Sequence, residues 1–128
     1  MYDKKCLIND LKQIGLYGGR STDYGKGAVI NLRSSIFNYM LVYESNIDDA
    51  FWGVTRSVKN DLKNNNEKYI TVFIDSKNNK LYAYDQKQID KLLITESCEK
   101  EYGNYRLKRN KLTNAIDYKD FYVFLTTL

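Results

Sequence analysis

Apolar residues follow helical spacing at the start of the chain and strand-like patterns further on. Four of them define one face of a predicted helix: Leu7, Ile8, Leu11 and Ile14. Gly15 follows at once and can end this helix in a left-handed conformation. Residues 28–34 and 36–44 are rich in β-branched and aromatic side chains, which predicts two strands.

A second amphipathic helix is predicted in the middle of the chain. Its apolar stripe consists of Ile47, Phe51, Val54, Val58 and Leu62. Asp48 or Asp49 is the expected N-cap of this helix. The single Trp52 lies one step off the stripe and is interpreted as a core residue, although an exposed tryptophan there would be an interface anchor.

The next segments predict a β-hairpin and a short helix. Residues 68–75 and 80–85 flank a four-residue connection, which places Asp75 opposite Lys80. Asp85 is then expected to cap a helix that carries three apolar residues: Ile89, Leu92 and Leu93.

The last third is predicted to hold a strand over 105–112, followed by a strand, or a short helix plus a strand, over 117–128. The overall order is α-β-β-α-β-β-α-β. It favours a single α+β or α/β domain over residues 1–128, with a mixed sheet flanked by helices.

Composition narrows the chemistry that this domain can perform. The chain has no histidine, no proline and two cysteines, Cys6 and Cys98. Ser-His-Asp triads, Cys-His pairs and histidine-bearing zinc sites are therefore excluded. Two distant cysteines make no disulfide framework, and no apolar run is long enough to span a bilayer. We expect a cytoplasmic protein with no membrane partner, and no cofactor unless carboxylates hold Mg²⁺.

The charge distribution permits an anionic partner. The formal net charge is +4 and the pI is about 8.9. Four basic residues crowd the predicted strand near the C-terminus: Arg106, Lys108, Arg109 and Lys111. They are interpreted either as phosphate contacts or as charges that protect the edge of a sheet.

Five of the seven glycines lie between Gly15 and Gly27, in a stretch that also holds Arg20 and Lys26. This stretch is either a basic loop that binds nucleic acid or nucleotide, or a plain connection made of tight turns. It is not a P-loop, because it runs from a helix to a strand and no Ser or Thr follows Lys26.

The order helix, hairpin, helix, hairpin resembles the PD-(D/E)XK nuclease fold, including the small archaeal-type Holliday junction resolvases. That family places one acid at the start of a strand and an acid-x-Lys triplet near the end of the next. Its acids bind Mg²⁺ and its lysine helps to activate water. Over about residues 1–95, the triplet would be Glu44-Ser45-Asn46, with asparagine in place of lysine. The position of the first acid would fall near Ala28 or Val29.

A second placement uses the predicted hairpin. Its triplet would be Asp85-Gln86-Lys87, with Glu67 as the first acid. Because side chains alternate along a strand, Glu67 would need a bulge to reach Asp85, and the helix cap is the competing interpretation of Asp85. The resemblance thus implies Glu44, Asp85 and Lys87 as candidate catalytic residues of a Mg²⁺-dependent nuclease.

Two functional hypotheses follow. The first is a DNA- or RNA-binding protein with a nuclease-like core and without efficient catalysis, encoded by a phage, plasmid or other mobile element. Its phosphate contacts would be Arg20, Lys26, Arg106, Lys108, Arg109 and Lys111. The second is a small inhibitor or immunity protein that binds a host defence enzyme or toxin, which predicts an apolar, tyrosine-bearing patch.

Overall fold

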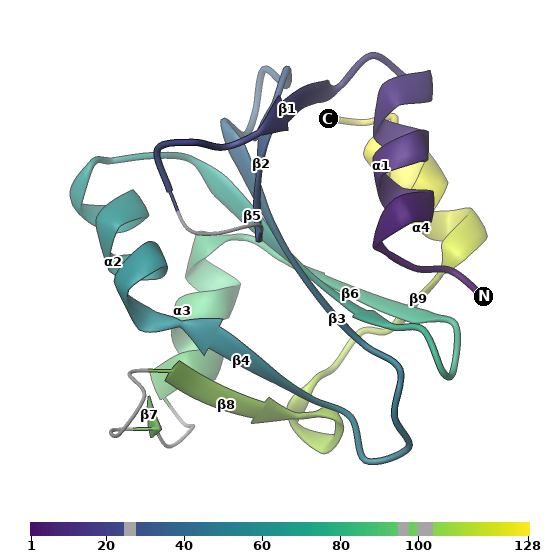
Figure 1. Cartoon of the computed structure of the whole chain (residues 1–128), viewed down its shortest axis with the longest axis vertical. Helices are drawn as coiled ribbons and strands as arrows, with labels where there is room; N and C mark the ends of the chain where they lie inside the picture. Colours follow the sequence, from purple (N-terminus) through teal and green to yellow (C-terminus); the bar gives the residue numbers. More distant parts are fainter. Residues whose placement is uncertain (25–27, 95–97, 100–103) are drawn as a thin grey trace.

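A mixed six-stranded sheet, helices on both of its faces and a smaller three-stranded sheet make up the fold (Figure 1). The computed structural model describes residues 1–24, 28–94, 98–99 and 104–128. The helices are α1 (Lys4–Gln13), α2 (Arg56–Asn64), α3 (Gln86–Ile94) and α4 (Tyr118–Leu125). The strands are β1 (Tyr17–Arg20), β2 (Val29–Leu32), β3 (Tyr39–Ser45), β4 (Phe51–Thr55), β5 (Tyr69–Asp75), β6 (Lys80–Tyr84), β7 (Cys98–Glu99), β8 (Asn104–Lys108) and β9 (Ile116–Asp117). A 3₁₀ turn spans Arg109–Lys111.

The large sheet has the strand order β1-β2-β3-β5-β6-β9, and only β3 and β5 are parallel neighbours among its described pairs. Their register runs from Tyr39 opposite Tyr69 to Ser45 opposite Asp75, so both strands end at the same edge. Every residue of β5 is buried, as expected for a central strand that is covered on both faces. The fold class predicted from the sequence, a single α+β unit, is confirmed.

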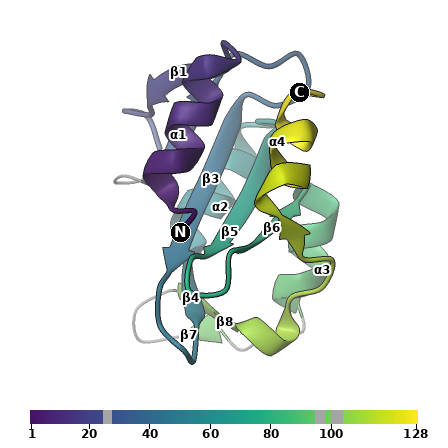
Figure 2. The same ribbon diagram turned by 90° about the vertical axis from the view of Figure 1, so that its right-hand side faces the viewer.

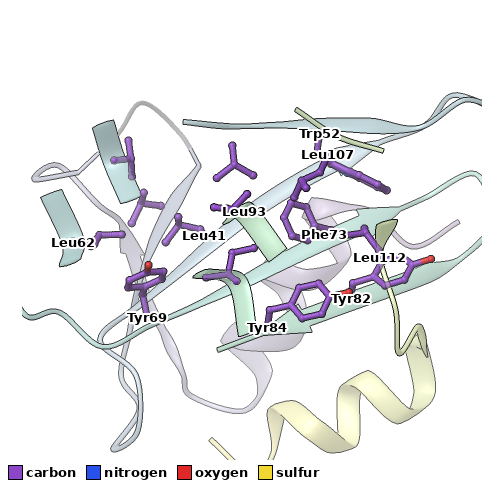
Figure 3. Close-up of a cluster of buried hydrophobic side chains, with 14 of the residues drawn as sticks. Leu41, Trp52, Leu62, Tyr69, Phe73, Tyr82, Tyr84, Leu93, Leu107 and Leu112 are labelled. Atoms are coloured by element: carbon purple, nitrogen blue, oxygen red, sulfur yellow. The ribbon is translucent and has the colours of Figure 1, made fainter. Parts of the chain in front are cut away.

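Each face of the large sheet carries its own apolar core. Helices α1 and α4 lie side by side on one face (Figure 2). Leu7 and Phe121 from these helices are fully buried. On the other face, α2, α3 and strands β4 and β8 of the small sheet cover a second cluster. Several aromatic side chains belong to this cluster, and Trp52 and Tyr84 each contact the buried ring of Phe73 (Figure 3).

Several local predictions are confirmed. Helix α1 is followed by Gly15 with a φ of +78°, the left-handed conformation expected there. The hairpin β5–β6 has its four-residue connection, with Asp75 opposite Lys80. Asp85 accepts a hydrogen bond from the backbone of Gln88 at 2.9 Å, and the Gln88 side chain accepts one from the backbone of Asp85 at 2.9 Å. This reciprocal pair is a capping box at the start of α3.

The helix predicted around residues 47–62 is partly wrong. Phe51–Thr55 is strand β4, and the helix begins only at Arg56. Exposed and buried side chains alternate along β4, and each of its residues pairs with β8, more than 45 positions later. Asp48 and Asp49 therefore cap no helix. Trp52 lies in a strand and is 2% exposed, so its interpretation as a core residue is confirmed.

The C-terminal segment and the glycine-rich stretch also differ from expectation. The chain ends in helix α4, which follows the two-residue strand β9, rather than in a strand. Within the glycine-rich stretch, Tyr17–Arg20 forms edge strand β1. A side chain at Gly18 would lie 2.9 Å from the carbonyl oxygen of Asn31, so this glycine permits close strand pairing. Lys26 lies outside the described residues.

Candidate nucleic-acid interface

The β4–β8 pair presents a polar and aromatic outer face. Trp52 and Leu107 are opposite each other and point into the core. One residue away on each strand, Phe51 pairs with Lys108 and both side chains are exposed. Arg106 lies on the same outer face, since side chains alternate along a strand. We call Phe51, Arg106 and Lys108 the ribbon face.

An aromatic ring and a guanidinium group are stacked on the ribbon face. The Arg106 guanidinium carbon lies 4.2 Å from the centroid of the Phe51 ring, well inside the range of a cation–π interaction. Phe51 remains 41% exposed beneath this contact. Gly53 stands opposite Arg106 and adds no side chain, so the surface beside the stack stays low.

The first hollow at this face has a volume of about 690 Å³. Its walls are Ile47, Asp49, Ala50, Phe51, Arg106, Lys108, Arg109 and Asn110. We call it the ribbon hollow. Three cationic side chains and one carboxylate line it, which favours an anionic ligand.

Arg109 has a structural partner in the wall of the ribbon hollow. Its Nε donates to the carboxylate of Asp75 at 2.5 Å, and Asp75 is fully buried. Its terminal nitrogens donate to the carbonyl oxygens of Asp48 at 2.6 Å and Ile47 at 3.3 Å. These contacts tie the segment before β4 to the end of β5. Arg109 therefore differs from Arg106 and Lys108, whose charges face outward.

A second hollow of about 490 Å³ lies at the end of β3. Its walls are Lys4, Arg20, Ala28, Val42, Tyr43, Glu44, Phe51, Trp52 and Gly53. We call it the strand-end hollow. Phe51 lines both hollows, so the ribbon face continues into the strand-end hollow.

The charged groups of the strand-end hollow influence one another. The backbone N–H of Lys4 donates to the Glu44 carboxylate at 2.9 Å, which joins the start of α1 to β3. Partial burial lowers the pKa of Lys4, the nearby Glu44 carboxylate opposes this, and the charge of Arg20 lowers the pKa further. The hollow thus gathers two cationic side chains around one acid.

The two placements of the nuclease pattern fall in different hollows of the structure. Of the two positions expected for the first acid, Ala28 lines the same hollow as Glu44, whereas Val29 is buried in the core. Asp85 and Lys87 line a different hollow, beside α3. Glu44 is opposite Ile74, whereas Asp85 follows Tyr84, which is opposite Thr71. The acids Glu44 and Asp85 therefore lie toward opposite ends of the sheet.

Metal ligands are sparse in this arrangement. No group of three or more Asp, Glu or Cys side chains that could hold a metal ion occurs within residues 1–24, 28–94 and 104–128. Glu44 is the single carboxylate that lines the strand-end hollow among the described residues. A lone carboxylate that already accepts a hydrogen bond from a helix start is a poor Mg²⁺ site.

Beneath the interface, the buried Trp52 indole nitrogen has no hydrogen-bond partner among the described residues. Tyr43 and Trp52 both form part of the wall of the strand-end hollow. Burial raises the pKa of Tyr43 to about 12, so its hydroxyl stays neutral at physiological pH.

Of the residues singled out from the sequence, Arg20 and Glu44 meet in one hollow, and Arg106, Lys108 and Arg109 in the other. Lys111 is exposed at the end of the 3₁₀ turn and lines neither hollow.

Sequence reasoning missed Phe51 and Lys4 as functional candidates. Phe51 was assigned to the apolar stripe of a helix. Strand alternation, with Trp52 and Val54 buried, was the signal that could have placed it outward. No signal in the sequence links Lys4 to Glu44, because only the packing of α1 beside β3 brings them together.

The sequence matches no known family model, and comparisons with curated proteins and with solved structures find no similar protein. Within the part of the chain that the structure describes, no helix has the length and apolar character needed to cross a bilayer.

Proposed function

We propose that this protein binds nucleic acid through the ribbon face and the adjoining strand-end hollow. The observation that carries the proposal is the ribbon face itself, where Arg106 lies over the exposed ring of Phe51 and Lys108 is exposed opposite it. Neither side chain forms an ion pair within the described residues, so both charges are available to phosphates. Arg20 adds a cation to the strand-end hollow.

The proposal includes a nuclease-like core without efficient catalysis. This part of the proposal takes up the resemblance to PD-(D/E)XK nucleases, for which the chain offers the order α1, strands β1–β4, α2 and the β5–β6 hairpin. In the first placement, Ala28 or Val29 would stand where the family has an acid, and Asn46 where it has the lysine. Binding to nucleic acid would then persist without efficient Mg²⁺-dependent cleavage. A cytoplasmic protein of a phage, plasmid or similar element fits this role.

The test is a salt titration of binding to labelled nucleic acid. Arg106→Gln/Lys108→Gln should weaken binding and reduce the slope of log affinity against log salt by about 2, since two phosphate contacts are lost. The matched control is Lys63→Gln/Lys68→Gln. It removes the same charge from two exposed positions that line neither hollow. Equal losses in both variants would point to nonspecific charge attraction and contradict the proposed site.

A second candidate, a protein inhibitor or immunity protein, is favoured by a different surface. Tyr2, Tyr118 and Tyr122 line an apolar hollow of about 470 Å³ between α1 and α4, and the rings of Tyr2 and Tyr118 are stacked at 6.2 Å. Tyrosine is enriched at protein interfaces. Affinity purification with wild type and with Tyr118→Ala would test it. A partner that is lost with this variant, together with no nucleic-acid binding, would replace the first proposal.

A further inference from the structure

We infer that the nucleic acid bound at the ribbon face is single-stranded, with an unpaired base stacked on the layer formed by Arg106 and Phe51. This inference rests on the proposed function and names the ligand class of that site. Its basis is the shape and chemistry of the β4–β8 outer face.

The stacked pair offers a flat surface to a base. The Arg106 guanidinium carbon lies over the Phe51 ring, 4.2 Å from its centroid, so an aromatic ring and a planar, cationic group are combined at one place. Unpaired bases stack on aromatic rings and on guanidinium planes, whereas the bases of a duplex are already stacked on one another. A duplex could use the charges of this layer but not its plane.

The surroundings leave room for a base. Gly53 pairs with Arg106, and among the described residues a side-chain carbon at Gly53 would meet only the Asn104 amide, at 3.7 Å. The surface next to the stack is therefore open. Phe51 is 41% exposed, so part of its ring is open to a ligand.

Cationic side chains flank the stack on both sides. Lys108 is opposite Phe51 in the ribbon hollow, and Arg20 lies in the strand-end hollow, which also includes Phe51. A single strand that crosses the stack would place successive phosphates toward these two cations. Asp49 and Glu44 also line the hollows, which disfavours a wide, continuous phosphate surface such as that of a duplex.

The experiment compares one labelled oligonucleotide of mixed sequence with the same strand annealed to its complement, by fluorescence anisotropy at fixed salt. Wild type should bind the single strand more tightly. Phe51→Ala should weaken single-strand binding about tenfold and leave duplex binding unchanged, because one stacked base is lost. Val123→Ala, which truncates an exposed apolar residue on α4, is the control and should change neither.

Arg106→Lys provides a second variant, which keeps the positive charge but removes the planar guanidinium group on which a base could stack. It should weaken single-strand binding and keep the salt dependence of wild type. Equal or tighter binding of the duplex by wild type, or an unchanged single-strand affinity in Phe51→Ala, would overturn the inference while the proposed function stands. Failure to bind either form would overturn both.

Discussion

The ion pair between Arg109 and Asp75 provides the sharpest prediction about stability. Asp75 is fully buried, and its carboxylate accepts hydrogen bonds from Arg109 Nε at 2.5 Å and from the backbone and side chain of Asn78 at 3.3 and 3.2 Å. Replacing Arg109 by glutamine leaves a buried charge that, within the described residues, keeps two neutral, longer contacts, both from Asn78. It also releases the carbonyl oxygens of Ile47 and Asp48.

Removal of one partner from a buried ion pair costs roughly 3–5 kcal/mol. Arg109 keeps 31% of its side chain exposed, so water can reach the vacated position. We therefore expect Arg109→Gln to lower the free energy of unfolding by about 3 kcal/mol, the low end of that range. Lys108→Gln, the neighbouring exposed cation, should change it by less than about 0.5 kcal/mol.

Urea denaturation of these variants, with Asp75→Asn and the double variant, completes a mutant cycle. The double variant should lose less stability than the sum of the single ones, with a coupling energy of about 1–3 kcal/mol, because no buried charge then remains. If Arg109→Gln were no less stable than Lys108→Gln, the ion pair would not hold the β4–β8 pair to the large sheet, and the reasoning would be refuted.

Three further predictions concern other parts of the chain. Asp85→Ala should cost about 1 kcal/mol in urea denaturation by loss of the α3 cap and leave nucleic-acid affinity unchanged; a loss of affinity would instead return Asp85 to the site. Burial raises the pKa of Tyr43 from 10.0 to about 12, so the unfolded chain loses this proton first. The raised pKa therefore contributes fully to the free energy of unfolding below pH 10, and this contribution is lost as the pH rises to about 12. Urea denaturation at several pH values should show that the free energy of unfolding falls less steeply with pH in Tyr43→Phe than in wild type. An equal fall in both proteins would contradict the assignment. Ala28→Asp should place a second carboxylate beside Glu44 and make the melting temperature rise with Mg²⁺ or Mn²⁺, which wild type should not show; no metal-dependent shift would count against the nuclease-like placement.

Local sequence signals were sufficient for the elements that depend on neighbouring residues. The left-handed Gly15 and the capping role of Asp85 were predictable because each depends on the residues beside it. The hairpin β5–β6 was also predictable, since its four-residue connection determines the register.

The β4–β8 strand pair could not be predicted in the same way. The residues of β4 satisfy a helical spacing and a strand alternation at once, and only pairing with β8 decides between them. The role of Arg109 was hidden for a related reason. Its position next to Arg106 and Lys108 indicated a shared phosphate site, but the 3₁₀ turn directs it to Asp75.

The sequence was sufficient to predict several residues of the candidate site, but not how they are grouped in space. The basic residues near the C-terminus and the acid Glu44 were visible in the sequence, but their grouping around Phe51 depends on the packing of β4 across the end of β3. The resemblance placed the vacant acid position near Ala28 or Val29. Ala28 lines the same hollow as Glu44, whereas Val29 is buried in the core.

The measurement that tests the central claim most directly is the affinity for single-stranded and duplex oligonucleotides over a range of salt concentrations, with wild type and Arg106→Gln/Lys108→Gln. The proposed site predicts binding that weakens steeply with salt, and a slope reduced by about 2 in the variant. No binding by wild type at low salt, or identical slopes for the two proteins, would contradict it.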